Sequence, residues 1–156
     1  MPLNLTPKGA RFIQNQEGCS LKLYLDADGH LTIGYGHLVI ENAAIFKGGI
    51  SVAQAQGLFD LDIKRVINAL NQIKPLDILP PGNCQDAVIS FVFNIGIYAF
   101  EESTMLRDIA LGNLRDVPDQ MKRWVKGKRG NVIAGLEKRR AAEAEMFQQG
   151  LDEVKK

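Results

Sequence analysis

The chain has 156 residues, of which 46% are hydrophobic and 24% are charged. This length and composition are typical of one globular domain with its own core and exclude a disordered chain. There are 19 Lys and Arg residues against 18 Asp and Glu residues, a net charge of +1, so the overall charge offers no case for nucleic acid or a membrane surface as a partner.

The chain also lacks the sequence signs of secretion or membrane insertion. Its two cysteines, Cys19 and Cys84, are too few for a disulfide scaffold. No apolar run approaches the roughly 20 residues that span a bilayer, and the first residues lack the apolar core of a secretory signal. We therefore expect no signal peptide and no stable membrane anchor, and a chain that stays in the cytoplasm until something else releases it. Cys19 is expected to be a small buried filler.

The first element predicted is a helix from Pro7 to Glu17. Thr6 is a candidate N-cap, and Pro7 suits the first helical position. Gly18 suits a left-handed stop directly after Glu17.

A small antiparallel sheet is predicted next, from Leu21 to Leu38. The apolar pattern changes there to a period of two, and Asp28-Gly29 is a hairpin signal. Residues 45–50 are expected to be a loop.

The rest of the chain predicts helices. A long helix begins at its candidate N-cap Ser51 and runs to about Ile73, and the stretch from Gln85 to Ile95 is apolar on nearly every side. The second pattern marks the buried central helix of a helical lobe. Three further helices are predicted, from the cap Ser103 to Leu111, from Asp116 to Val125 and from Asn131 to about Gln149.

This order of elements favours an α+β fold, because the strands come first and the helices follow. The long helix would carry the chain from the sheet to the helices. We expect a β-rich lobe over residues 18–50 and a helical lobe from residues 7–17 and 74–150, bridged by the helix 51–73. A cleft between two such lobes is a usual place for a ligand.

Glu17 is the first candidate for chemistry. The end of a helix carries about half a negative charge and disfavours an ionised carboxylate by about 0.3–1 kcal/mol. That is too little to keep Glu17 protonated near neutral pH, so partial burial would have to add to it. A protonated carboxylic acid that faces a cleft is a general acid. The alternative is an exposed glutamate at a frayed helix end.

Asp26 and Thr32 lie on the two arms of the predicted hairpin. A three-residue loop over 28–30 would make them face each other on one side of the sheet, where a carboxylate and a hydroxyl could hold one water. A two-residue loop at Asp28-Gly29 would place Asp26 opposite Leu31 and turn Thr32 to the other face. Both registers stay open, as does the plainer interpretation of a turn-flanking Asp and a β-favouring Thr.

Together the three side chains fit inverting glycoside hydrolysis. In that reaction one carboxylic acid protonates the leaving oxygen, and one carboxylate activates a water on the opposite face of the sugar. A separation of about 6.5–9.5 Å between the two carboxyl groups would fit inversion, and about 5–5.5 Å would fit retention.

The run from Glu17 to Leu38 closely resembles the phage-type lysozymes, the endolysins of glycoside hydrolase family 24. That family has a Glu, an Asp nine positions later and a Thr six positions further on, followed by Ile-Gly-x-Gly-His. This chain matches at Glu17, Asp26, Thr32 and the residues 33–37. Two further blocks, at residues 90–107 and 123–143, follow the family order, and the resemblance covers about residues 10–148.

The resemblance implies a single lysozyme-like domain over residues 1–156. It also implies an activity: these enzymes hydrolyse the β-1,4 bond between N-acetylmuramic acid and N-acetylglucosamine in peptidoglycan and so lyse the host cell. The substrate would be the peptidoglycan glycan strand. The chain would act as a monomer without a cofactor, and it would depend on a separate membrane pore protein, a holin, for access to the wall.

The resemblance also assigns roles to residues. Glu17 would be the acid, and Asp26 with Thr32 would handle the water. Leu38, Phe93 and Ser103 match cleft positions that contact sugar. No metal is expected, because two histidines without cysteine partners nearby are too few for a site. We expect His37 to make a hydrogen bond within the β-rich lobe rather than to act in catalysis.

Two alternative functions are weighed against this one. A lytic transglycosylase needs the acid Glu17 but no water activator, so the presence of Asp26 and Thr32 argues against it. A non-catalytic lysozyme-like domain that only binds glycan or serves a structural role would be expected to lose the acid or the water pair, and all three residues are present.

Overall fold

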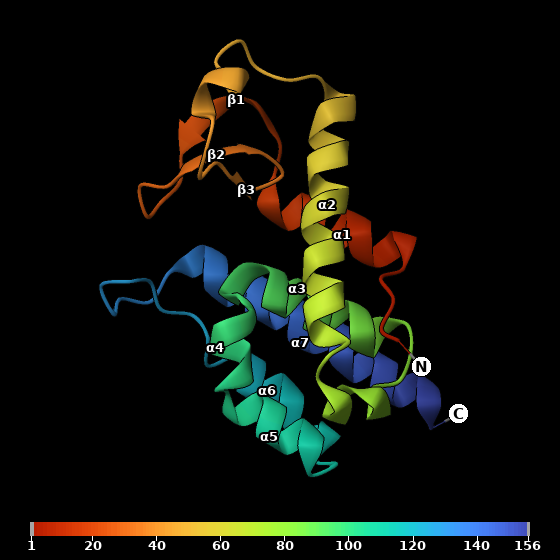
Figure 1. Cartoon of the computed structure of the whole chain (residues 1–156). Coiled ribbons are helices and arrows are strands. Elements are labelled where there is room, and N and C mark those ends of the chain that lie inside the picture. The colour runs from red at the N-terminus through yellow and green to blue at the C-terminus, as the bar shows by residue number, and fades with distance from the viewer. Residues whose placement is uncertain (1, 156) are drawn as a thin grey trace. The chain divides into compact units, whose positions relative to one another are not determined.

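The computed structural model describes residues 2–155 (Figure 1). Its helices and strands are α1 (Pro7–Glu17), β1 (Ser20–Leu25), β2 (Leu31–Gly34), β3 (His37–Leu38), α2 (Val52–Leu70), α3 (Asn83–Ile95), α4 (Ile97–Glu101), α5 (Thr104–Ala110), α6 (Val117–Met121) and α7 (Ala134–Val154). Three short 3-10 helices join them, namely η1 (Ala43–Phe46), η2 (Lys74–Ile78) and η3 (Leu114–Asp116). The small early sheet and the helices after it confirm the predicted α+β class.

The chain divides into two compact units. Residues 11–65 form one, which we call the sheet unit, and the described residues before and after them form the other, the helical unit. The helices α1 and α2 each begin in one unit and end in the other.

The predicted bounds of α1 are confirmed, and its first turn is anchored within the helical unit. Thr6 Oγ1 accepts a hydrogen bond from Gly9 N at 3.0 Å, which is the predicted N-cap. Asp86 on α3 accepts hydrogen bonds from both the backbone N and the Oγ1 of Thr6. A β-carbon at Gly9 would collide with the Asp86 carboxyl. Glycine at position 9 therefore lets the start of α1 lie directly on Asp86.

The three strands form an antiparallel sheet in the order β1-β2-β3. The pairs Ser20–Gly34 and Tyr24–Thr32 enclose four steps of β1 but only two of β2, so β1 contains a bulge. Ser20 Oγ donates to the carbonyl oxygen of Lys22 at 2.6 Å inside that bulge. The bulge bends β1 before the hairpin that follows.

Two local predictions for the sheet unit are wrong. The bulge breaks the period of two predicted for β1, and Leu21 and Leu25 lie 38% and 67% exposed. Residues 45–50, predicted as a loop, contain the last part of η1. Asn42, with a φ of 56°, makes the turn that starts η1.

The helix α2 begins with a reciprocal cap. Ser51 Oγ accepts from Gln54 N at 3.0 Å, and Gln54 Oε1 accepts from Ser51 N at 2.8 Å. The predicted start is confirmed, while the helix ends at Leu70 rather than near Ile73. The Asn71 side chain, directly after the helix, accepts a hydrogen bond from Leu3 N at 2.7 Å.

The helix α3 is the buried centre of the helical unit, as predicted. It starts at Asn83, two residues before the predicted Gln85, and its residues 83–92 are all buried. The helix α7 packs along it, and a β-carbon at Gly150 would lie 2.6 Å from Cys84 Sγ. Glycine at position 150 therefore allows α7, which continues past the predicted Gln149 to Val154, to lie close to α3. The large core side chains around α3 are Phe91, Phe100, Met105, Ile109, Met121 and Phe147.

Three predictions between α3 and α7 need correction. The sequence pattern does not predict α4, which begins directly after Gly96, a residue whose φ is 91°. The helix predicted over 116–125 is divided between η3 and α6 and ends at Met121. The start predicted at Asn131 lies in a turn closed by a bridge between Lys126 and Val132, so α7 begins at Ala134.

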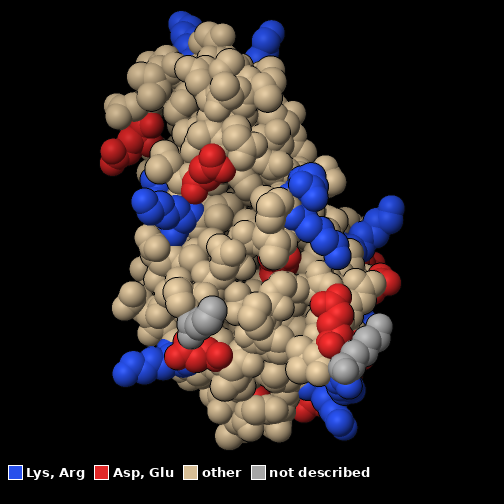
Figure 2. Space-filling model, turned by 90° about the vertical axis from the view of Figure 1, so that its right-hand side faces the viewer, with Lys and Arg blue, Asp and Glu red and all other residues tan. Residues whose placement is uncertain are grey.

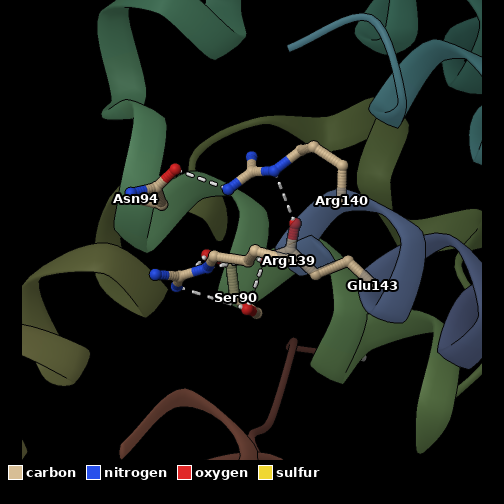
Figure 3. A network of polar contacts seen from close by, with 5 residues as sticks. All are labelled: Ser90, Asn94, Arg139, Arg140 and Glu143. Carbon is tan, nitrogen blue, oxygen red and sulfur yellow. Dashed lines mark hydrogen bonds and ion pairs between the residues drawn. The ribbon is translucent and has the colours of Figure 1, made fainter. Parts of the chain in front are cut away.

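A buried polar network joins α3 to α7 (Figure 3). Glu143 Oε2 accepts from Ser90 Oγ at 2.5 Å and from Arg139 Nε at 3.2 Å, and Glu143 Oε1 lies 3.1 Å from Arg140 Nε. Arg140 also donates to Asn94 Oδ1. Burial raises the pKa of Glu143, and the guanidinium groups of Arg140 and Arg139 oppose that rise. The two arginines balance the buried carboxylate, and an isolated charge there would be strongly destabilising.

The surface is mixed in charge. On the face shown in Figure 2, cationic and anionic side chains both occur, separated by broad uncharged areas. This distribution agrees with the net charge of +1. Within residues 2–155, no helix has both the length and the apolar character that crossing a membrane requires.

Candidate active site

Glu17, Asp26 and Thr32 all belong to the sheet unit. Glu17 is the last residue of α1 and is half-buried. Its carboxyl group lies against the backbone between β2 and β3, because a β-carbon at Gly36 would be 2.5 Å from Glu17 Oε1. Gly36 also has a φ of 72°, a conformation that other residues adopt at a cost. Gly36 is therefore the residue that leaves room for the Glu17 carboxyl.

Asp26 holds the hairpin turn with its own side chain. Its Oδ1 accepts from Asp28 N at 2.9 Å and from His30 N at 2.8 Å. These two hydrogen bonds, the one from His30 first, lower the pKa of Asp26 below its ordinary value. Asp26 is thus an ionised carboxylate at neutral pH, able to accept a proton but not to supply one.

The register of the hairpin differs from both predicted registers. The loop is Ala27–Gly29, with Asp26 N donating to the carbonyl oxygen of His30 at 2.9 Å and Thr32 paired with Tyr24. The Asp26 side chain forms the turn one residue earlier than Asp28-Gly29 predicts. Because cross-strand partners share a face, Asp26 and Thr32 lie on the same face as diagonal neighbours rather than directly opposite.

Thr32 is buried on this face and uses its hydroxyl hydrogen within the hairpin. The side chain is buried, with 2% exposed, and Oγ1 donates to the carbonyl oxygen of His30 at 2.8 Å. A threonine hydroxyl has one hydrogen to donate and can still accept. Thr32 Oγ1 therefore offers acceptor capacity on the face that carries Asp26.

His37 makes a hydrogen bond within the sheet unit, and its partner is on α2. His37 Nδ1 lies 2.8 Å from Asp62 Oδ2, and the His37 ring meets the ring of Phe46 edge-on at 6.4 Å. Arg65 Nη1 lies 3.5 Å from the other oxygen of Asp62. The pair joins β3 to α2 inside the sheet unit, in agreement with the structural role expected of His37.

The three predicted sugar-contact residues fall in different units. Leu38 is in the sheet unit and is 48% exposed, whereas Phe93 and Ser103 are in the helical unit. Ser103 is buried and caps α5: its Oγ donates to Phe100 O at 2.7 Å and accepts from Leu106 N at 3.1 Å. The sugar contacts of all three stay predictions.

Sequence reasoning missed features around the candidate residues. Cys19 is exposed rather than buried. The motif contains Gly36, but nothing in it indicates a contact with Glu17. Tyr24 stands two positions before Asp26, which directly follows β1, and that period-two spacing is the signal that could have drawn attention to it. The described residues contain no group of three His, Cys, Asp or Glu side chains placed to hold a metal ion.

Comparison with known sequences shows that the chain is similar to phage proteins. Residues 14–143 match the family described as phage lysozyme. The chain is 36% identical over 151 residues to an endolysin of Acyrthosiphon pisum secondary endosymbiont phage 1, an alignment that covers 94% of this chain and 99% of that protein. It is 31% identical to an endolysin of Bacillus phage PZA, with 95% of this chain aligned to 56% of that longer protein.

Solved structures show the same likeness. The endolysin from Escherichia coli O157:H7 phage FAHEc1 matches with a TM-score of 0.81 and 32% identity, over 93% of each chain. The muramidase domain of SpmX from Asticaccaulis excentricus matches with a TM-score of 0.77 and 30% identity, over 93% of this chain and 97% of that one.

Proposed function

This chain belongs to the phage lysozyme family, and we propose that it is an endolysin muramidase with Glu17, Asp26 and Thr32 as its catalytic groups. It hydrolyses the β-1,4 bond between N-acetylmuramic acid and N-acetylglucosamine in peptidoglycan, and it does so with inversion. The two compact units work together as one lysozyme-like domain.

In this proposal Glu17 is the general acid. It donates a proton to the glycosidic oxygen as the bond from that oxygen to the muramic acid C1 breaks. Its place at the end of α1 supports the role, because the helix and the backbone at Gly36 together fix where its carboxyl lies.

Asp26 and Thr32 handle the water. The water donates one hydrogen bond to the Asp26 carboxylate and the other to Thr32 Oγ1, which leaves an oxygen lone pair free to attack C1 from the opposite face. One proton of that water passes to Asp26 as the new bond forms. The observation that carries the proposal is that one unit holds all three groups: hydrogen bonds keep Asp26 ionised on the hairpin face that also carries Thr32, while the Glu17 carboxyl lies against the backbone at Gly36.

The test is hydrolysis of purified peptidoglycan by the Glu17→Gln variant. We expect the rate of release of reducing ends to fall at least about 100-fold, since a general acid typically contributes a factor of 10²–10⁴, with an unchanged melting temperature. Glu41→Gln, which neutralises an exposed glutamate of the same unit, is the matched control and keeps full activity. A Glu17→Gln variant as active as the control removes Glu17 from the mechanism.

The chemistry of the ends separates the alternatives. A hydrolase leaves free muramic acid reducing ends, whereas a lytic transglycosylase leaves anhydro ends because the sugar's own hydroxyl closes the ring. A glycan-binding or structural domain would bind peptidoglycan without producing either. We expect free reducing ends alone.

We also infer the cellular setting from the family. The chain is held in the cytoplasm of the host bacterium, reaches the wall when a separate pore protein (a holin) opens the membrane, and acts as a monomer. Expression in bacteria with and without membrane permeabilisation tests the first part. Lysis only after permeabilisation supports it, and spontaneous lysis of intact cells overturns it. Sedimentation of the purified protein tests the second part.

A further inference from the structure

Tyr24 lies in the middle of the sheet face that carries the candidate catalytic residues. It is the direct cross-strand partner of Thr32 and precedes Asp26 by two residues, so all three share one face of the hairpin. Glu17 meets the sheet at the other end of β2, at Gly36. Tyr24 and Thr32 therefore lie between two points of the hairpin. One is Gly36, where the Glu17 carboxyl contacts the backbone, and the other is the turn that the Asp26 side chain holds.

Tyr24 and Thr32 differ in how much of each is exposed to solvent. Thr32 is 2% exposed, whereas Tyr24 is 37% exposed. A ligand that approaches this face meets the tyrosine before it meets the threonine. Within residues 2–155 the Tyr24 hydroxyl has no hydrogen-bond partner, so its hydrogen is available to a ligand.

The electrostatic surroundings of the Tyr24 hydroxyl favour its neutral, hydrogen-bond-donating form. Burial raises the pKa of Tyr24 above its ordinary value of 10.0, and the charges of Glu17, Asp26 and Cys19 raise it further. The hydroxyl is thus a neutral donor at neutral pH. Its electrostatic neighbours include both candidate carboxyl groups.

We propose that Tyr24 is a substrate-binding residue whose hydroxyl donates a hydrogen bond to the N-acetylhexosamine unit held between Glu17 and Asp26, while its ring forms part of the wall of that site. The inference rests on the proposed function, because it assigns a further role within the same site. Such a contact fixes the sugar relative to the acid and the water, and misplacement of a reacting group by a small distance lowers the rate.

The test compares Tyr24→Phe with the parent enzyme on soluble, uncross-linked peptidoglycan strands. The change removes one hydroxyl and keeps the ring. We expect kcat/KM to fall about tenfold, the value of one hydrogen bond, with an unchanged melting temperature and unchanged limbs of the pH profile. Tyr24→Ala, which also removes the ring, is expected to lose more.

The matched control is Tyr98→Phe, which removes a hydroxyl from an 84% exposed tyrosine on α4. Its kcat/KM should stay within about twofold of the parent. A binding measurement separates ground-state contact from catalysis: in the inactive Glu17→Gln background, calorimetry should show weaker binding of the same strands when Tyr24→Phe is added. If the loss falls on kcat and binding is unchanged, the hydrogen bond forms in the transition state, which equally supports the proposal.

The proposal is overturned if Tyr24→Phe stays within about twofold of the parent in kcat/KM. It is also overturned if the activity of the Tyr24 variants falls only in parallel with their melting temperatures, since that is the result of a purely structural role. Both outcomes differ from failure of the proposed function, which is an active Glu17→Gln variant or a product with anhydro ends.

Discussion

Gly36 is the residue on which the position of the Glu17 carboxyl depends. Its φ of 72° and the 2.5 Å between a β-carbon there and Glu17 Oε1 are two separate reasons for glycine. The first concerns the stability of the turn between β2 and β3, and the second concerns the candidate acid. A suitable control can separate the two.

We predict that Gly36→Ala lowers both stability and activity. The strained backbone should cost about 1–2 kcal/mol in the free energy of unfolding. Displacement of the Glu17 carboxyl should reduce kcat by about 100-fold, because a shift of about 1 Å in a catalytic group has that effect. Urea unfolding and hydrolysis rates measured well below the melting temperature check the two parts.

Gly112→Ala is the matched control. Gly112 has a φ of 81°, and a β-carbon there would meet nothing within 4 Å. It should lose a similar amount of stability and keep its activity. Equal loss of activity in the two variants would mean that the Gly36 effect is only a matter of backbone strain.

At this scale the sequence singles out three candidate residues but does not predict how they lie relative to one another. Glu17, Asp26 and Thr32 stand out by type and spacing, and all three lie in the sheet unit. The register between Asp26 and Thr32 was not predictable, because the turn depends on two hydrogen bonds accepted by the Asp26 side chain. Turn signals such as Asp28-Gly29 do not include that contribution.

At the scale of the elements, a buried carboxyl group on α3 holds the start of α1. Asp86 on α3 is 1% exposed and accepts two hydrogen bonds from Thr6. Burial raises the pKa of Asp86, and the bonds from Thr6 oppose that rise without cancelling it. The folded chain therefore holds a proton on Asp86 at pH values where the unfolded chain has lost it.

A pH dependence of stability follows from this shift. Because the folded state binds more protons, the contribution of Asp86 is fully present below its ordinary pKa of 3.8 and decreases as the pH rises toward the raised value. We predict that Asp86→Asn, which cannot ionise, gains stability relative to the parent as the pH increases from about 3.8, until the difference levels off. Urea unfolding at a series of pH values measures the difference.

Asp77→Asn serves as the control for this experiment, since Asp77 is an exposed carboxylate of the same unit. Its difference from the parent should change far less with pH. The interpretation of Asp86 is wrong if the parent instead gains on Asp86→Asn as the pH rises.

The starts of the helices with side-chain caps were predicted well, whereas the start of α7, which has no such cap, was not. The caps at Thr6, Ser51 and Ser103 each mark the residue at which a helix begins. The start of α7 has no side-chain cap, and a bridged turn occupies the residues before it. The strand β1 was predicted, but its bulge is a product of pairing with β2 and leaves no local signature.

For the whole molecule, the order of strands and helices was enough to predict the class of fold. What the sequence could not supply is the buried network of Arg139, Arg140 and Glu143. Charged residues at that spacing are usually interpreted as a solvated helix face. Their burial depends on the packing of α7 along α3, which is a tertiary property.

The central claim is that a water held by Asp26 and Thr32 attacks the sugar on the face opposite the proton donor Glu17. Proton NMR of the product in the first minutes of peptidoglycan hydrolysis tests it most directly, before the two anomers of the new reducing end interconvert. Cleavage of a β-1,4 bond with inversion predicts that the α anomer of N-acetylmuramic acid accumulates first. Early accumulation of the β anomer, or of an anhydro sugar in its place, would contradict the account.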